Sequence, residues 1–80
     1  MPRPIRLDPD APIASLLEQT GLSQSELARR LDGPPAVVSA PLLMEREGRS
    51  VTLRWLCRLA DAAGFRLEIR LIPRGSKKST

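Results

Sequence analysis

The stretch Leu22–Leu31, which reads LSQSELARRL, decides the fold of this 80-residue chain. Ser23 and Glu26 form an S-x-x-E capping box, a pattern typical of a helix start. Three apolar residues follow at i, i+1 and i+4, a spacing that predicts a narrow buried helix face. They are Leu27, Ala28 and Leu31. We expect Gly33 to adopt a positive φ and to end this helix sharply.

A second apolar segment, residues 34–47 (PPAVVSAPLLMERE), follows the turn. The two prolines that open it suit a helix start. Pro41 does not suit a helix interior, because it removes a hydrogen bond and clashes with the carbonyl group of Val37. The segment is therefore either one kinked helix or two pieces that break near Ala40, and we favour the kink or break. A short helix, a tight turn and a second helical segment form the skeleton of a helix-turn-helix unit, which usually docks on duplex DNA.

The residues before this unit predict an extended arm and one helix. Residues 1–12 contain four of the eight prolines and cannot be helical as a unit, so residues 1–10 are expected to be an extended arm. Asp10 is the expected N-cap of a helix that runs to about Thr20, with Pro12 in its first turn. The predicted buried side chains of this helix are Ile13, Leu16, Leu17 and Thr20.

The residues after the unit change from a helical to a strand-like period. Ser50 or Thr52 is expected to cap a helix over about residues 53–63. The core positions predicted from its helical spacing are Leu53, Leu56, Ala60 and Ala63. Residues 66–72 then alternate charged and apolar side chains, which predicts a half-buried strand. Residues 74–80 form a polar basic tail with nothing to bury, and we expect this tail to be disordered.

An isolated strand leaves its backbone groups unpaired, so the predicted strand needs a partner. The three candidates are residues 3–7 of the arm, the same strand of a second copy, and a strand of another protein. We predict strand-mediated homodimerisation. The residues assigned to it are Ile5, Leu67, Ile69 and Leu71. The expected fold is mainly α, with four to five helices and one C-terminal strand in a single domain over residues 1–73.

The composition favours a binding protein over an enzyme. The chain contains no histidine and a single cysteine, Cys57, which excludes an internal disulfide and a Cys-based zinc cluster. No paired base, nucleophile or metal-ligand spacing joins its carboxylates, so no catalytic residue, metal or cofactor is expected. Thirteen Lys and Arg against nine Asp and Glu give a net charge of +4, which suits a nucleic-acid partner. No apolar run reaches the ~20 residues that span a bilayer, and we expect a cytoplasmic protein without a membrane partner.

Four stretches, covering most of residues 13–73, match the pattern of one protein family. They are LSQSELARRL at 22–31, VS at 38–39, EREGRSVTLRWLCRLADAAG at 45–64 and FRLEIRLIP at 65–73. With them the chain resembles the Xre/Cro–repressor type of helix-turn-helix domain, which includes small phage repressors and HigA-type antitoxins. The resemblance implies a transcriptional repressor that binds double-stranded DNA sequence-specifically, as a homodimer on a palindromic operator. An autoregulating antitoxin, which also binds a cognate toxin protein, is a special case of that function.

The resemblance and the charge pattern assign DNA contacts to the helix-turn-helix unit and its neighbours. By position, Gln24 lies where such proteins contact the DNA backbone, Ser39 lies on the recognition helix, and Arg49 lies in the loop before the last helix. The predicted DNA-binding residues are Gln24, Ser25, Arg29, Pro35, Ala36, Val37, Ser39, Arg46, Arg49 and Arg54. Glu45 and Glu47 interleave with these arginines, and we expect them to pair with or orient the neighbouring arginines.

The alternative is a protein-interaction module on a degenerate helix-turn-helix fold that has lost base readout. Residues 34–36 (PPA) open the recognition segment with almost no hydrogen-bonding capacity, and Pro41 lies inside it. Four residues distinguish the two functions by where they lie. If all four lie on one exposed, positively charged face, DNA binding is favoured, and if they lie on separate parts of the surface, the interaction module is favoured. Those four residues are Gln24, Ser39, Arg46 and Arg49.

Overall fold

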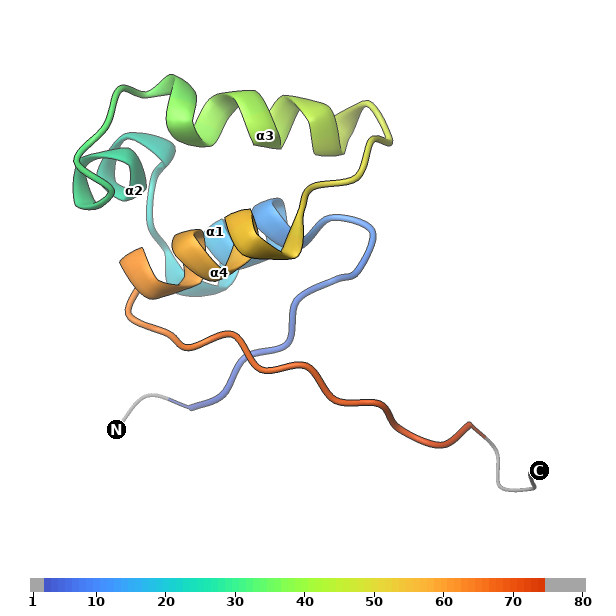
Figure 1. Cartoon of the computed structure of the whole chain (residues 1–80). Helices are drawn as coiled ribbons and strands as arrows, with labels where there is room; N and C mark the ends of the chain where they lie inside the picture. The colour runs from blue at the N-terminus through green and yellow to red at the C-terminus, as the bar shows by residue number, and fades with distance from the viewer. Residues whose placement is uncertain (1–2, 75–80) are drawn as a thin grey trace.

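Four helices build the protein, and two extended segments flank them (Figure 1). The computed structural model describes residues 3–74, so the expected disordered tail lies outside the described residues except for Arg74. The helices are α1 (Pro12–Thr20), α2 (Gln24–Arg30), α3 (Ala36–Arg46) and α4 (Leu53–Ala62). Contacts join α3 to α1 and α2, and α4 also contacts α1 and α2. The predicted mainly α fold with four helices is confirmed.

The predicted N-caps of α2 and α4 are confirmed, whereas that of α1 is wrong. The hydroxyl groups of Ser23 and Thr52 each accept a hydrogen bond from the amide three residues on, at 3.0 and 3.2 Å. In α1 the N-cap is Ala11. Asp10 lies in the turn before the helix, where its amide donates to the Asp8 carboxylate at 2.9 Å. Because Ala11 has no side-chain acceptor, the first amides of α1 need a partner from elsewhere in the fold.

The C-termini of α2, α3 and α4 end with a left-handed residue in the hydrogen-bond pattern of a Schellman motif. The left-handed residues are Asp32, Gly48 and Gly64, with φ of 59°, 79° and 93°. After α2 the amides of Asp32 and Gly33 donate to carbonyl groups of the last helical turn at 3.0 and 3.1 Å. The expected positive φ at Gly33 is therefore wrong. The left-handed position falls one residue earlier, where the short polar side chain of Asp32 tolerates it.

α3 runs without a break through Pro41, so the predicted break near Ala40 is wrong. Pro41 has no N–H to donate to the Val37 carbonyl, and this leaves one helical hydrogen bond unmade. Its ring is buried on the inner face of α3, as are Val38 and Leu42. Burial of the ring methylenes, at about 0.8 kcal/mol each, offsets much of the ~3 kcal/mol that proline costs in a helix interior. Apolar packing therefore holds both halves of the segment in one helix.

One apolar core lies between the helices, and most of its predicted members are confirmed. Its buried side chains are Ile13, Leu16, Leu27, Ala28, Val38, Leu42, Leu56, Leu59, Ala60 and Ala63. Half-buried side chains around it include Leu17, Thr20, Leu31 and Val37. Leu59 is fully buried although the predicted core did not include it, and Leu53 is wrong as a core residue because it is 57% exposed. Leu53 is the first residue of α4, and it lines a hollow between α4 and the terminal segments.

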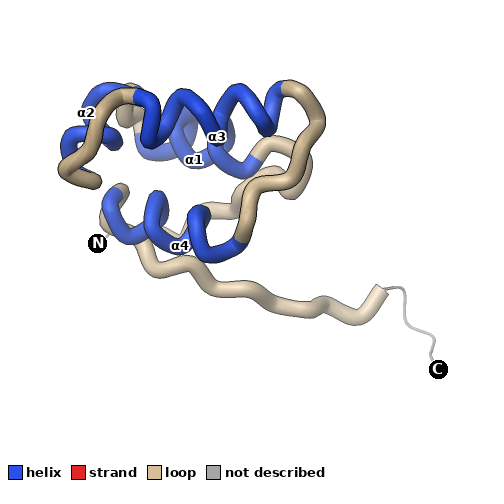
Figure 2. The backbone as a smooth tube through the Cα atoms, turned by 45° about the horizontal axis from the view of Figure 1, so that its top comes forward, coloured by secondary structure: helices blue, strands red, loops and turns tan. Residues whose placement is uncertain are grey.

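The segments on either side of the helices are extended, but neither forms a strand (Figure 2). The predicted strand over residues 66–72 is wrong for the described part of the chain, since no backbone hydrogen bond joins it to the N-terminal arm there. A strand is defined by such bonds, and a single copy offers this segment no partner. Ile5 and Leu67 are half-buried against the core, whereas Ile69 and Leu71 are 60% and 95% exposed.

Candidate nucleic-acid interface

α3 presents one face to the core and the opposite face to solvent. Its buried residues are Val38, Pro41, Leu42 and Glu45. At 3.6 residues per turn, the opposite side of the helix carries Ala36, Ala40 and Leu43, which are all exposed and which we call the outer face. Ser39 and Arg46, seven residues apart, share one flank of this face and are exposed as well. The outer face and this flank are the parts of α3 that can enter a groove of DNA.

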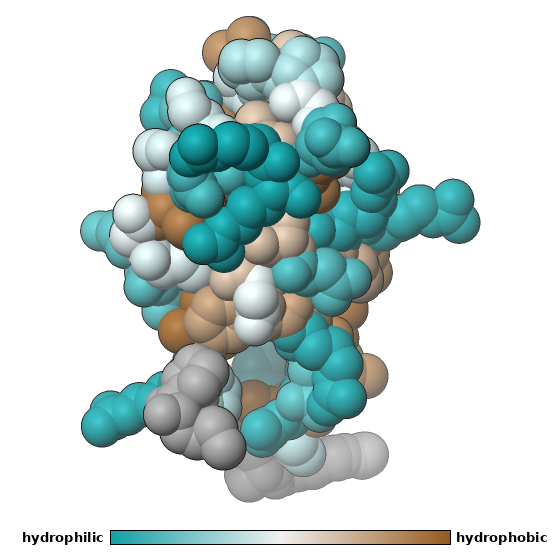
Figure 3. Space-filling model, turned by 90° about the vertical axis from the view of Figure 1, so that its left-hand side faces the viewer, coloured by the Kyte–Doolittle hydropathy of each residue, from teal (hydrophilic) through white to brown (hydrophobic). Residues whose placement is uncertain are grey.

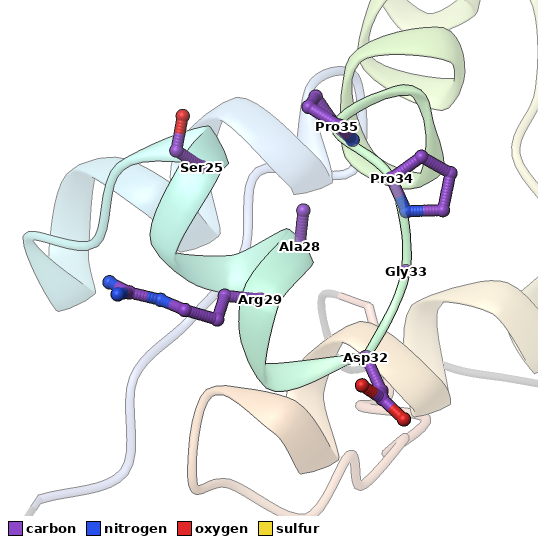
Figure 4. A pocket seen from close by; sticks show the side chains of 7 residues that line it. All are labelled: Ser25, Ala28, Arg29, Asp32, Gly33, Pro34 and Pro35. Atoms are coloured by element: carbon purple, nitrogen blue, oxygen red, sulfur yellow. The ribbon is translucent and has the colours of Figure 1, made fainter.

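A hollow of about 430 Å³ lies between α2 and the start of α3 (Figure 4). The residues that line this α2–α3 hollow are Ser25, Ala28, Arg29, Asp32, Gly33, Pro34 and Pro35. Ser25, Arg29 and Pro35 are predicted DNA-binding residues, so the fold brings three of them together. Figure 4 shows the Arg29 side chain extending away from Pro35, while Asp32 lies in the turn after α2.

The arginines of α2 share the carboxylate of Glu26. Arg29 pairs with Glu26, and Arg30 Nε donates to it at 3.3 Å. The hydrogen bonds from Arg29 and then from Arg30 hold the pKa of Glu26 below its ordinary value. Arg30 Nη1 also donates to the Ala62 carbonyl at the end of α4, at 3.3 Å. Arg30 therefore ties α2 to α4, whereas the Arg29 side chain is 76% exposed and faces solvent.

Three further exposed arginines follow one another along the chain from the last turn of α3 to the first turn of α4. Arg46, Arg49 and Arg54 are exposed in the last turn of α3, the following loop and the first turn of α4. Arg49 Nη2 donates to Glu47 at 2.6 Å, which confirms the local pairing expected for that carboxylate. Within residues 3–74, Arg46 and Arg54 make no ion pair. The ten-residue separation between Ala36 and Arg46 corresponds to about 15 Å at 1.5 Å per residue.

The remaining predicted contacts lie beside these elements. Gln24 is the first residue of α2 and is half-buried. Val37 is half-buried, packs against the core and lies on the flank of α3 away from Ser39. Four residues are expected to share one exposed face if the protein binds DNA. Two of them, Ser39 and Arg46, share one flank of α3. Gln24 and Arg49 lie on other elements, at the start of α2 and after the end of α3, so the four residues do not share one face, and this scattered placement is the one expected of the interaction module.

Glu45 is the residue of this region that the sequence interpretation placed wrongly. Its carboxylate is buried and accepts hydrogen bonds from the amides of Ile13, at 2.7 Å, and Ala14, at 3.0 Å. It supplies the cap that Ala11 lacks, and its negative charge suits the N-terminus of α1. The expected pairing of Glu45 with neighbouring arginines is therefore wrong. Its position three residues after Leu42, on the inner face of α3, is the sequence signal for this role.

The molecular surface has two different ends. Figure 3 views the α2 end with α3 at the top, where hydrophilic side chains surround patches of apolar surface. At the other side of the helices, a hollow of about 1,230 Å³ lies between them and the terminal segments. Apolar residues that line this terminal hollow include Leu53, Leu56, Phe65, Leu67 and Ile69. Arg29 and Arg46 thus lie apart from the terminal hollow, whereas Arg49 is one of the residues that line it.

Comparison with known proteins finds no match: no family model, no curated protein and no solved structure matches this chain. No helix within residues 3–74 is long and apolar enough to cross a membrane. The same described residues contain no group of three or more His, Cys, Asp or Glu side chains that could hold a metal ion.

Proposed function

We propose that the protein is a sequence-specific DNA-binding transcriptional repressor that acts as a homodimer on a palindromic operator. One observation carries the proposal: the exposed outer face of α3 has exposed arginines near both of its ends. The two ends of the helix lie about 15 Å apart along its axis. Since the major groove of B-DNA is about 12 Å wide, the long arginine side chains near the two ends of the helix can reach the phosphates on both sides of a groove that α3 occupies.

In this arrangement the two groups of arginines bind phosphates on different strands of the duplex. Ser25 and Arg29, beside the α2–α3 hollow, bind phosphates on one side of the groove. Arg46 and Arg54 bind phosphates on the other side, and Arg49 joins them when it exchanges Glu47 for a phosphate. Ser39, on the polar flank of α3, donates to a base edge. The bound protein covers the operator and thereby excludes RNA polymerase.

The homodimer in this proposal rests on the C-terminal extended segment. Ile69, Leu71 and Ile72 are 60%, 95% and 73% exposed. Within the described chain, residues 66–72 make no backbone–backbone hydrogen bond. Pairing of this segment with its copy buries these side chains and satisfies the unpaired backbone groups. A palindromic operator requires the two α3 helices of such a dimer to lie about 34 Å apart, one turn of DNA.

A second candidate is a protein-interaction module, and the chemistry of the outer face favours it. Ala36, Ala40 and Leu43 offer no side-chain hydrogen bond to a base. A cognate toxin is the partner expected if the protein is an antitoxin. Co-purification with the product of a co-transcribed neighbouring gene supports that role, and the lack of such a neighbour argues against it.

The proposal is tested by titrating the protein into labelled DNA from its own upstream region at two salt concentrations, with a scrambled duplex as competitor. We expect binding that withstands the competitor and weakens with salt by a log–log slope of about −0.9 per neutralised phosphate. Weak binding that is equal on both duplexes contradicts the proposal and favours the interaction module.

A pair of matched variants links this binding to α3. Arg46→Gln removes one phosphate contact per protomer, so the salt slope of a dimer should become shallower by about 2. Arg66→Gln removes the same charge from the segment that follows α4, which lies on the far side of the helices from α3 (Figure 1). We expect Arg66→Gln to leave the slope unchanged. Equal effects of the two variants would mean that binding follows net charge and not the α3 surface.

A further inference from the structure

The outer face of α3 is apolar in a place where the proposed function requires contact with base edges. Ala36 and Ala40 are exposed, and Leu43 is 54% exposed, so the three together form one apolar patch on the solvent side of α3. The three lie within about 60° of one another around the helix axis. On this face the side chains present only methyl and methylene groups to whatever covers them.

The backbone at the start of α3 adds few hydrogen-bond donors. Pro34 and Pro35 have no N–H group. The amides of Val37 and Val38 already donate to the Pro34 and Pro35 carbonyls, at 2.9 and 3.1 Å. The amide of Ser39 is likewise bonded, to the Pro35 carbonyl at 3.0 Å. Among the amides of this turn within residues 3–74, only that of Ala36 is left without a hydrogen bond, so the backbone replaces few of the hydrogen bonds that the outer face lacks.

Charge decides which class of molecule covers this face. Exposed Arg46, which is in no ion pair within residues 3–74, lies in the last turn of α3, and exposed Arg29, which pairs with Glu26, lies near the other end of the helix. The chain as a whole carries a net charge of +4. A polyanion gives Arg46 a partner and can take Arg29 from Glu26 while α3 is covered, whereas an apolar protein surface leaves Arg46 without a partner. Duplex DNA is the occupant that fits both the cations and the apolar face.

Of the four bases, only one presents an apolar group in the major groove of DNA. Thymine presents its C5 methyl group there, while the other edges present donors and acceptors. An aliphatic surface placed over a donor or acceptor leaves that group unpaired, which disfavours binding. We therefore propose that the outer face of α3 reads thymine methyl groups, so that the operator carries A·T pairs opposite Ala36, Ala40 and Leu43. This inference rests on the proposed DNA-binding function and adds the chemistry of the bases that are read.

The experiment begins with in vitro selection from a duplex library with a randomised centre. The enriched duplex is then synthesised again with single thymines replaced by deoxyuridine, which keeps the base pair and removes only the methyl group. We expect the affinity to fall about fourfold for each methyl group that contacts the protein, the factor that corresponds to burial of one such group. Thymines outside the contacted positions, replaced in the same way, serve as controls and should show no change.

Each outcome separates the inference from the function on which it rests. Enrichment of a sequence whose binding is insensitive to every uracil replacement overturns the thymine readout and leaves the proposed DNA-binding function intact. Failure to enrich any sequence overturns both and favours a protein on the outer face of α3.

A protein variant tests the assignment to one side chain. Leu43→Ala truncates an exposed residue, so the helical circular dichroism spectrum should be retained. We expect this variant to abolish the uracil effect at one thymine per half-site while the effect at other thymines remains. A uracil effect that is unchanged at every position in Leu43→Ala removes Leu43 from the readout.

Discussion

At the scale of single residues, Glu45 has the largest structural role outside the apolar core. Its buried carboxylate on α3 bonds the first free amides of α1. In Glu45→Gln one of the two oxygens becomes an NH₂ group, which meets an amide donor and cannot accept from it. We expect this variant to lower the free energy of unfolding by about 1.5–3 kcal/mol, the range for losing a hydrogen bond to a charged group. Urea denaturation monitored by circular dichroism measures the change.

Glu47→Gln is the matched control for this prediction. Glu47 lies two residues further on, and the exposed Arg49 is its partner. Exposed ion pairs contribute about 0–1 kcal/mol, so the free energy of unfolding should change by less than 1 kcal/mol. Equal losses in the two variants would show that the α1 cap contributes no more than a surface ion pair.

Glu26 gives the folded protein a pH dependence at the same scale. The two arginines of α2 hold its pKa below the ordinary value of 4.5 in the folded state. The ionised carboxylate therefore stabilises the fold above pH 4.5, and this contribution is lost as the pH falls through the lowered pKa. We expect Glu26→Gln to be less stable than the unmodified protein at about pH 7 and to approach it at about pH 3. Urea denaturation at both pH values measures the difference, and a difference that grows on acidification contradicts the assignment.

At the scale of elements, α3 is the helix whose sequence and structure disagree most. Pro41 costs its helix about 3 kcal/mol relative to alanine, whereas burial of about two more methylene groups by the proline ring offsets about 1.6 kcal/mol. Pro41→Ala should therefore raise the free energy of unfolding by about 1–2 kcal/mol. Urea or thermal denaturation tests this, and a loss of stability would mean that packing of the ring outweighs the missing hydrogen bond.

Pro35→Ala is the control for the same substitution at a helix start. Pro35 precedes the first residue of α3, where a missing N–H removes no helical hydrogen bond. We expect its free energy of unfolding to change by less than about 0.5 kcal/mol. The contrast between the two variants isolates the cost of a proline inside the helix from the general effect of replacing a proline on the unfolded chain.

The features that could be predicted from the sequence are those that depend on neighbours along the chain. The caps at Ser23 and Thr52 and the apolar spacing of the helices need only three or four adjacent residues. The sequence left open whether α3 is one helix or two pieces, because its continuity depends on how other helices cover Pro41. The prediction of a strand over residues 66–72 was wrong for the same reason, because a strand needs a partner backbone and a single copy does not provide one.

The candidate site divides in the same way. Ser25, Arg29 and Pro35 could be grouped from the sequence because a short turn joins α2 to α3 and keeps them close. The role of Glu45 could not be predicted from the sequence, because its partners lie more than thirty residues away, at the start of α1. An acidic residue among arginines suggests a local ion pair, and only its position on the buried face of α3 distinguishes it from Glu47.

At the scale of the whole molecule, the helices and the terminal segments enclose the terminal hollow, of about 1,230 Å³. A chain of 80 residues buries only roughly 60–65% of its unfolded surface, so its core alone gives a narrow margin of stability. The apolar side chains beyond Leu67 are largely exposed in a single copy. Association of two copies through residues 66–72 adds the buried apolar area that a small domain needs.

A pair of double variants on the two faces of this extended segment tests the dimer. Ile69→Gln/Leu71→Gln removes the apolar face, whereas Glu68→Gln/Arg70→Gln alters the charged face and leaves the net charge at +4. By sedimentation equilibrium at micromolar concentration, we expect a dimer for the unmodified protein and the control but a monomer for the first variant. Because Ile69 and Leu71 are exposed in one copy, that monomer should stay folded and bind only one half of the operator, with a salt slope about half as steep. A monomeric mass for the unmodified protein contradicts strand-mediated dimerisation. The structure would then give no reason to expect a palindromic operator.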